Sequence, residues 1–389
     1  MKKLLFVVYG LGIGGIEKCL VNLVNALNHE KYDITIAVMN PEYDLVSEIT
    51  PTVKIIRFED QFINTTDTVG LIKRTNGIIP KIKLFVQYVF YRLAVKLRIR
   101  PWLVQRWLKE QYDYAIAYTH TGYVPNYVID RTKAKTKVLW YHTLWGNSEN
   151  LECYCKFDKI VAVSQFCKET FLRMYPKLSN KLYVLYNLYD FDDIEKKALE
   201  APDCLDIKKS RIVTVGRLSP EKGYELAIKT CSVLEQKFQS SFEWFWVGDG
   251  PEKYRLEAKQ LIQELKLEGC FHLLGNKINP YPYIKNCDVY VQPSEREAFC
   301  TTIIEARTLK KPIVTTEVGS FYEQLENGKN AFITEHTPSA MADKISLLMN
   351  SSEMRRSFSE NCFQPMDYNL KQLKAYNEFF NICEGETIK

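Results

Sequence analysis

Residues 289–306 read VYVQPSEREAFCTTIIEA: a short apolar run, a polar loop and then a segment with helical spacing. A continuous apolar run, rather than an alternating one, is typical of a strand that is buried on both faces of a parallel sheet. We therefore expect a strand at 289–292 that ends in a polar loop and is followed by a helix.

The same succession is found along most of the chain. Apolar runs occur in the first half at 4–9, 33–39, 114–118, 138–141, 160–163 and 182–186, and in the second half at 211–215, 242–247, 270–274, 289–292 and 312–315. Segments with helical spacing, such as 16–27, lie between them. Alternation of strands and helices predicts an α/β fold, in which helices cover both faces of parallel sheets.

The length of 389 residues favours two domains, because single hydrophobic cores stop growing at about 250–300 residues. Residues 187–203 are rich in Asp, Glu and Lys and contain no strand pattern, so we place a hinge there. The sequence thus predicts two Rossmann-like, doubly wound domains at 1–190 and 200–365. A final amphipathic helix, at 370–383 within the segment 366–389, is expected to pack back toward the N-terminal domain.

The composition is that of a soluble globular protein, with 46% hydrophobic and 25% charged residues. It excludes a wholly disordered chain, a collagen and a coiled coil. Eleven scattered cysteines and five dispersed histidines form no disulfide framework and no zinc ligand set, so reduced thiols in the cytoplasm are expected. The sequence contains no run of about 20 apolar residues, so no membrane-spanning helix is expected. The first apolar run leads into glycines and has no signal-peptide cleavage site.

Basic residues are concentrated in one segment, 71–111, although the net charge of the whole chain is only +5. This segment contains a single acid, Glu110, and ten basic residues: Lys73, Arg74, Lys81, Lys83, Arg92, Lys96, Arg98, Arg100, Arg106 and Lys109. Each basic residue near an anionic membrane contributes about 1 kcal/mol to binding, so we expect peripheral contact with such a surface. The alternative is a helix with a solvated basic face; nucleic-acid binding is not expected, because no recognised motif accompanies the charge.

Four constellations can carry chemistry, and the first is the glycine-rich segment GLGIGGIE at 10–17. It follows a predicted strand and opens a predicted helix, so Gly14 and Gly15 let backbone amides approach an anionic ligand. The glycine spacing fits a dinucleotide fingerprint, but Met39 and Asn40 occupy the place where that fingerprint needs an acid. Pyridine-dinucleotide binding is therefore disfavoured, and the alternative to an anion site is a tight strand–helix turn.

The second constellation is VGRLSPEKG at 215–223. It carries Arg217 and Lys222 on one loop after a predicted strand. A forked guanidinium and a compact ammonium together suit a diphosphate. The alternative is a solvated loop with ordinary salt bridges.

The third constellation is the pair of carboxylates in the opening stretch, Glu297 and Glu305. We expect Glu297 before the helix and Glu305 two turns inside it, about 12 Å apart at the helical rise of 1.5 Å per residue. The two acids could then hold different parts of one extended ligand, while the free amides of 299–301 take an anionic group. The alternative is one capping acid and one surface acid.

The fourth constellation is His142, at the carboxyl end of a predicted strand, where open parallel sheets bind ligands. A lone histidine is also a common structural residue. Weaker marks at strand ends are VGDGPE at 247–252, GNK at 275–277, and Asn187, each of which can be a simple turn.

In this order and spacing, the motifs resemble the retaining nucleotide-sugar glycosyltransferases of the GT-B fold, in the large group 1 and family 4 family with its Glu-x7-Glu motif. The resemblance covers nearly the whole chain except about 55–111, and it is most specific between Gly216 and Glu305. It implies two Rossmann-like domains that face a central cleft.

The resemblance also implies roles for individual residues. Arg217 and Lys222 would hold the donor diphosphate, Glu305 the ribose hydroxyls and Glu297 the donor sugar. Four further elements would contribute: the amides of Phe299, Cys300 and Thr301 to the phosphates, Gly14 and Gly15 to the diphosphate or the acceptor, His142 to the transferred sugar, and Asn276 and Lys277 to the base.

By the same resemblance, the protein is expected to be a hexosyltransferase in bacterial surface polysaccharide biosynthesis. It would move a sugar with retention to a glycan or lipid-linked acceptor at the inner face of the cell membrane. No metal is expected, since two cations can neutralise the diphosphate. Ala298 and Cys300 stand where the family usually has glycine, which leaves the sugar undefined. The alternatives are a GT-B sugar epimerase or phosphorylase, or a non-catalytic nucleotide-sugar-binding protein.

Overall fold

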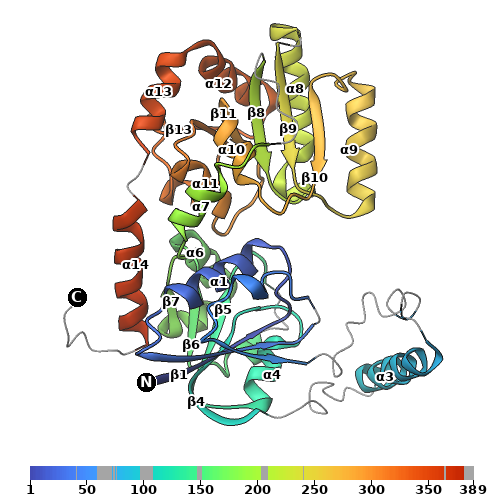
Figure 1. Cartoon of the computed structure of the whole chain (residues 1–389), viewed down its shortest axis with the longest axis vertical. Helices are drawn as coiled ribbons and strands as arrows, with labels where there is room; N and C mark the ends of the chain where they lie inside the picture. Colours follow the sequence, from blue (N-terminus) through green and yellow to red (C-terminus); the bar gives the residue numbers. More distant parts are fainter. Residues whose placement is uncertain are drawn as a thin grey trace. The chain divides into compact units, whose positions relative to one another are not determined.

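The computed structural model describes residues 1–40, 42–58, 72, 75, 77–96, 108–146, 151–202, 209–239, 241–362 and 365–380 (Figure 1). The chain divides into two compact units. The first consists of Met1–Val163 and Cys167–Leu188, and the second of Ser164–Phe166 and Tyr189–Lys389.

The first unit is built on a seven-stranded sheet in the order β3-β2-β1-β4-β5-β6-β7, and every pair of neighbours is parallel. The strands are β1 (Lys2–Val8), β2 (Tyr32–Val38), β3 (Lys54–Arg57), β4 (Leu108–Ala117), β5 (Thr132–Tyr141), β6 (Lys159–Ala162) and β7 (Leu182–Val184). The order reverses between β1 and β4, so the loops after these two strands flank a switch point of the sheet, where α/β folds bind ligands.

Helices and short turns connect these strands. They are α1 (Gly15–Ala26), η1 (Val46–Glu48), α3 (Ile78–Lys96), α4 (Val124–Arg131), α5 (Leu151–Tyr154), α6 (Gln165–Met174) and η4 (Pro176–Lys181). Helix α1 buries one face through Leu20, Leu23 and Val24, as its helical spacing predicts.

The second unit repeats the architecture with a six-stranded parallel sheet in the order β10-β9-β8-β11-β12-β13. Its strands are β8 (Ser210–Val215), β9 (Phe242–Val247), β10 (Phe271–Gly275), β11 (Val289–Gln292), β12 (Ile313–Thr316) and β13 (Ala331–Thr334). Here the order reverses between β8 and β11, which places the loops after these two strands at the second switch point.

The helical elements of the second unit are α7 (Phe191–Lys197), η5 (Pro220–Lys222), α8 (Tyr224–Phe238), α9 (Glu252–Glu264), α10 (Tyr281–Asn286), α11 (Thr301–Thr308), η6 (Gly319–Glu323), α12 (Pro338–Asn350), α13 (Ser352–Glu360) and α14 (Pro365–Phe379). The core between sheet and helices contains Trp244, Trp246 and Phe271, which are 3% exposed or less. Such large apolar side chains fix the strands from which the site loops emerge.

The predicted fold class is confirmed, and all eleven predicted strands are present. Most strand ends shift by one or two residues, whereas β4 and β5 begin six residues earlier than predicted. Two strands were missed, β3 and β13. Both are four-residue edge strands that pair on one side only. β3 (KIIR) has charge at both ends and only two apolar residues between them, whereas β13 (AFIT) has an apolar run of three residues that was overlooked. The last helix, α14, begins five residues earlier than predicted; it groups with the second unit, and its packing toward the N-terminal domain stays a prediction.

Candidate functional site

The loop that follows β11 carries Glu297 into the second unit's switch point. Its backbone is fixed from the side: Thr316 donates a hydrogen bond to the carbonyl of Ser294, and Ser320 donates one of 2.8 Å to the carbonyl of Glu297. Ser294 is fully buried and Glu297 is 7% exposed. A polar loop that is this well buried and bonded is a rigid support for the Glu297 carboxylate.

The loop that follows β8 brings a cation to the same place. Lys222 ends the turn η5, and the next residue, Gly223, has a φ of +77°. A β-carbon at Gly223 would overlap the carbonyl oxygen of Pro293, so only glycine lets the two loops touch. The amide of Glu295 donates a 2.9 Å hydrogen bond to the carbonyl of Glu221, which ties the loops together by their backbones.

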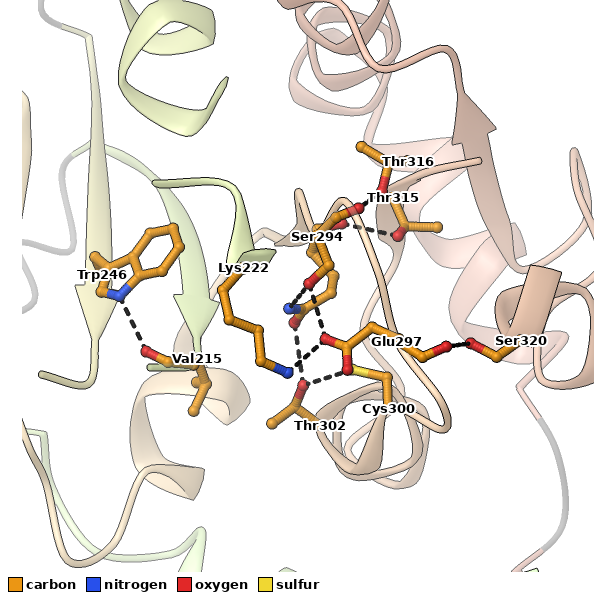
Figure 2. Close-up of polar contacts among 12 residues, drawn as sticks. Val215, Lys222, Trp246, Ser294, Glu297, Cys300, Thr302, Thr315, Thr316 and Ser320 are labelled. Carbon is orange, nitrogen blue, oxygen red and sulfur yellow. Dashed lines mark hydrogen bonds and ion pairs between the residues drawn. The ribbon is translucent and has the colours of Figure 1, made fainter. Parts of the chain in front are cut away.

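Lys222 and Glu297 form an ion pair in which Nζ lies 2.6 Å from Oε1 (Figure 2). Burial alone would lower the pKa of the Lys222 ammonium. The charge of Glu297, the nearby Cys300 and the hydrogen bond to Glu297 outweigh burial and raise that pKa, so the ammonium stays charged. Arg217 is exposed, and its positive charge acts on Lys222 to lower the pKa of that ammonium slightly, so a second cation lies near Lys222.

Further polar side chains surround Glu297 on the side of β11. Ser294 donates a 2.8 Å hydrogen bond to Oε1 of Glu297, and Gln292 donates one of 2.8 Å to Ser294. Thr302 lies 3.0 Å from the amide oxygen of Gln292, and the thiol of Cys300 lies 3.2 Å from the hydroxyl of Thr302 (Figure 2). Sequence reasoning missed Gln292 and Ser294, because polar residues at a strand end usually mark an ordinary turn.

Helix α11 corrects one expectation about the two acids. The helix begins at Thr301, with Cys300 as its N-cap, so Glu305 lies about one turn inside it and not two. The first half of the path from Glu297 to Glu305 is loop, and the predicted separation of about 12 Å, which assumed a continuous helix, does not apply. Glu305 is 7% exposed, as is Glu297, so neither is the surface acid of the alternative interpretation.

Residues 299–301 lie where the loop passes into α11. Phe299 and Cys300 are buried, and Thr301 opens the helix. Burial raises the pKa of the Cys300 thiol to about 12, so it remains protonated at neutral pH. The backbone amides of Phe299, Cys300 and Thr301, the expected anion donors, thus lie at the N-terminus of α11.

Two of the three weaker strand-end marks lie at this edge of the sheet, whereas Asn187 follows β7 in the first unit. The amide of Gly248 bonds to the carbonyl of Gly275 at 2.8 Å, and the amide of Asp249 bonds to Oδ1 of Asn276 at 2.9 Å. Lys277 lies with Nζ 5.7 Å from the centre of the Tyr283 ring. The loops after β9 and β10 are thus joined beside the loop of Arg217.

The first unit carries the remaining predicted residues, on the loops after β1 and β5. Gly14 is the N-cap of α1 and Gly15 its first residue, directly after β1. A β-carbon at Gly10 would fall 2.7 Å from a carboxylate oxygen of Glu42, which lies against the glycine-rich loop. Glu42 was missed, because nothing in the local sequence links it to that loop.

His142 follows β5, and a second histidine that sequence reasoning missed, His120, lies near the end of β4. Burial lowers the pKa of His142 to about 3, with a smaller contribution from His120, and lowers the pKa of His120 to about 4. Both imidazoles are therefore neutral near pH 7. Nε2 of His142 and Nδ1 of His120 are buried and make no hydrogen bond within the described part of the chain.

The basic segment is only partly described. Lys73, Arg74, Arg98, Arg100 and Arg106 lie outside the described residues, as do the side chains of Lys83, Arg92 and Lys96. Helix α3 itself is described, and seven of its large apolar side chains are exposed: Ile78, Ile79, Ile82, Phe85, Val86, Val89 and Leu93.

Two negative findings apply to the described ranges alone. In them, no group of three or more His, Cys, Asp or Glu side chains is arranged to hold a metal ion. The helices that the structure describes include none whose length and apolarity would allow it to cross a bilayer.

Two family models match consecutive parts of the chain. The model "Glycosyltransferase Family 4" matches residues 13–193, and "Glycosyl transferases group 1" matches residues 198–364. The first contains Gly14, Gly15, His120 and His142, and the second contains Arg217, Lys222, Glu297 and Glu305.

Individual proteins agree with the models. The chain is 25% identical, over 92% of its length and 93% of the relative's, to an N-acetylgalactosamine-N,N'-diacetylbacillosaminyl-diphospho-undecaprenol 4-alpha-N-acetylgalactosaminyltransferase of Campylobacter jejuni. It is 27% identical to the GPI3 subunit of yeast phosphatidylinositol N-acetylglucosaminyltransferase over 54% of this chain, but it spans only 46% of that protein.

A solved structure matches the fold over the full length. The crystal structure of Anabaena HepE in complex with UDP and glucose superposes with a TM-score of 0.71, covering 98% of this chain and 100% of that one at 18% identity. At this identity the likeness concerns the fold alone, a pair of parallel-sheet α/β units.

Proposed function

Because this chain belongs to the group 1 and family 4 glycosyltransferases, we propose that it transfers a sugar from a nucleotide-diphosphate sugar to a glycan or lipid-linked acceptor. The observation that carries the proposal is the meeting of Lys222 and Glu297, with Arg217 beside them, at the switch point of the second unit. Two cations and one carboxylate suit a ligand that has a diphosphate next to a hydroxyl-bearing group.

Departure of the diphosphate is the step that these cations would assist. As the bond between sugar and phosphate breaks, negative charge grows on the phosphate and positive charge on the sugar ring. Arg217 and Lys222 are fixed cations that stabilise the phosphate as it leaves, which lowers the barrier without reorganisation of solvent. Glu297 would hold sugar hydroxyls on the face where the bond breaks. We propose transfer with retention, in which the departing phosphate helps to deprotonate the acceptor.

The nucleoside would be held farther along the same edge. Glu305 would accept hydrogen bonds from the ribose hydroxyls, and the amides of Phe299–Thr301 would contact phosphate oxygens at the N-terminus of α11. Asn276 and Lys277 would lie beside the base, on the loop after β10. The proposal needs no metal, since Arg217 and Lys222 neutralise the diphosphate.

The first unit would contribute residues from the loops after β1 and β5. Gly14 and Gly15 would offer backbone amides to the diphosphate or the acceptor at the start of α1. His142 would exchange a hydrogen bond with the transferred sugar, as donor or as acceptor. Its lowered pKa keeps the imidazole neutral, the form that can do either.

A lipid-linked acceptor is supported by the full-length Campylobacter relative, whose name specifies an undecaprenol diphosphate. This would place the protein at the inner face of the membrane, in surface polysaccharide biosynthesis. Helix α3 offers a membrane contact: at 100° per residue, its seven exposed apolar side chains fall in an arc of about 120°. Its 19 residues contain four basic residues and no acid, which is the pattern of a helix that lies in an anionic interface.

Vesicle sedimentation tests the membrane contact. We expect the wild type to sediment with vesicles of phosphatidylcholine and phosphatidylglycerol, and to sediment less in high salt or without phosphatidylglycerol, because the attraction between basic residues and anionic lipid is then screened or lost. Phe85→Ser with Leu93→Ser should abolish sedimentation, and Leu256→Ser, an exposed leucine on α9, should leave it unchanged. Equal sedimentation of wild type and double variant, or of vesicles with and without the anionic lipid, would refute this contact.

Donor use is tested by a thermal-shift screen with UDP-, GDP- and ADP-sugars, since a ligand that binds only the folded state raises the melting temperature. The stabilising donor is then incubated with undecaprenyl-diphosphate-linked sugars, and the products are analysed by mass spectrometry and NMR. An extended lipid-linked glycan with retained configuration supports the proposal. A changed sugar without acceptor indicates an epimerase, and binding without any product indicates the non-catalytic alternative.

A further inference from the structure

The Glu297 carboxylate is oriented by a chain of buried side chains that starts on strand β11. The members are Ser294, Gln292 and Tyr290, with Thr302 and Cys300 from the start of α11 (Figure 2 shows Ser294, Thr302 and Cys300 around Glu297). Gln292 is 1% exposed, and Ser294 and Tyr290 are fully buried. Buried polar groups with complete partners fix one geometry, because an unmade bond would cost the full desolvation of the group.

The direction of every bond in this chain follows from the carboxylate. An ionised Glu297 can only accept, so the single hydroxyl proton of Ser294 is donated to it over 2.8 Å. Ser294 must then accept from Gln292, whose amide nitrogen lies 2.8 Å away. The amide of Gln292 therefore has one orientation, with its oxygen on the opposite side.

That oxygen receives two donors. The phenol of Tyr290 lies 2.8 Å and the hydroxyl of Thr302 3.0 Å from Oε1 of Gln292. Since the proton of Thr302 is used in this bond, the thiol of Cys300 is the donor in its 3.2 Å contact with Thr302. A neutral thiol, which its raised pKa maintains, is the form that can donate.

The backbone of the same loop is also fixed by hydrogen bonds. Thr315 donates a 2.8 Å hydrogen bond to the carbonyl of Gln292, in addition to the bonds from Thr316 and Ser320 to the carbonyls of Ser294 and Glu297. Both bonds at Oε1 of Glu297 come from Ser294 and Lys222. The carboxylate is thus held through one of its two oxygens, from the side of β11 and from the loop after β8.

We propose that Gln292 and Ser294 are positioning residues, which fix the orientation of the Glu297 carboxylate so that it meets the hydroxyls of the donor sugar. The role in sugar transfer rests on the function proposed above, whereas the hydrogen-bond coupling does not. Gln292 acts only through Ser294. In Gln292→Glu the side chain has no amide proton to give, so Ser294 turns its hydroxyl toward the new carboxylate and away from Glu297.

The test is a double-mutant cycle on kcat, with Kd for the nucleoside diphosphate measured beside it. We expect Ser294→Ala and Gln292→Glu each to lower kcat about 10-fold or more, with Kd changed less than about twofold, since one buried hydrogen bond to a charged group is lost. The variant with both substitutions should be no slower than either alone, because both remove the same bond. Thr214→Val, which removes a buried 2.7 Å bond to the carbonyl of Val291 but none toward Glu297, is the matched control and should keep its kcat.

The proposal would be overturned if the double variant lost kcat by the product of the two single losses, or if Ser294→Ala left kcat unchanged. If the wild type transfers no sugar from any donor, the proposed function fails, and the geometry is judged from unfolding free energies instead. There, Ser294→Ala and Glu297→Gln should show coupled effects if the bond exists and additive effects if it does not. Should Gln292→Glu fail to fold, the cycle with Ser294→Ala and Glu297→Gln still decides the question.

Discussion

Nζ of Lys222 lies 2.6 Å from Oε1 of Glu297, although 75 residues separate the two along the chain. They meet because β8 and β11 are neighbours in the sheet, so the loops after both strands leave it at the same edge. The pair joins a cation suited to phosphate with a carboxylate suited to sugar hydroxyls.

Removal of the cation is the first prediction. Lys222→Ala should lower kcat at least about 100-fold, because a fixed charge on the leaving phosphate is lost. It should also cost about 2 kcal/mol of folding stability, less than a fully buried pair, because the Lys222 side chain is 28% exposed. The control is Lys229→Ala, which removes an exposed ion pair on α8. Steady-state kinetics and urea unfolding measure both effects, and near-normal turnover would contradict the proposed role.

Removal of the second acid is predicted to act on binding. Glu305→Gln keeps the shape of the side chain but weakens its hydrogen bonds to ribose hydroxyls, so Kd for the nucleoside diphosphate should rise about 10-fold. Isothermal titration calorimetry measures this change. Glu264→Gln, at the end of α9, should bind as the wild type does. An equal Kd in Glu305→Gln and wild type would remove Glu305 from the nucleoside site.

The contact between the two loops depends on Gly223. Gly223→Ala should destabilise the protein by about 2 kcal/mol or more, because an alanine at positive φ is strained and its β-carbon overlaps the Pro293 carbonyl. Nucleotide affinity should fall with it, since Lys222 is the preceding residue. Gly269→Ala is the control, because a β-carbon there meets no atom within 4 Å. Thermal unfolding of the two variants compares them directly, and equal melting temperatures would contradict the packing described.

Acid sensitivity is expected from the two buried histidines. Their folded pKa values, about 3 for His142 and about 4 for His120, lie below the ordinary value of 6.5. Between these limits the unfolded chain binds more protons than the native one, so stability falls as the pH is lowered from 6.5 toward 4. The loss is about 1.4 kcal/mol per pH unit for each histidine.

Urea unfolding at pH 7 and at pH 5 tests this linkage. In His120→Asn and in His142→Asn, the change in unfolding free energy between pH 7 and pH 5 should be smaller than in the wild type, by the contribution of the histidine that was removed. His336→Asn, for which no such change is expected, serves as the control because His336 is exposed. A difference that is the same in all four proteins would show that other groups cause the acid sensitivity.

The sequence by itself predicted the architecture, and it named Lys222 and Glu297, which the structure brings together. Continuous apolar runs separated by helical segments are local patterns, and they located eleven strands, while the loops after β1, β5, β8 and β11 carried the predicted polar residues. The edge strand β3 escaped because charged residues flank its two apolar residues, and β13 escaped although it carries an apolar run of three residues.

Only the tertiary structure decided how the site is held. Which oxygen of Glu297 is occupied, the role of Gln292 and the presence of His120 and Glu42 depend on contacts between segments far apart in the chain. Such contacts follow from strand order and register, and a strand-end glutamine looks the same in sequence whether it points to solvent or to a buried serine. The periodicity of a strand or helix depends on neighbouring residues, whereas the partner of a buried polar side chain depends on how the whole unit packs.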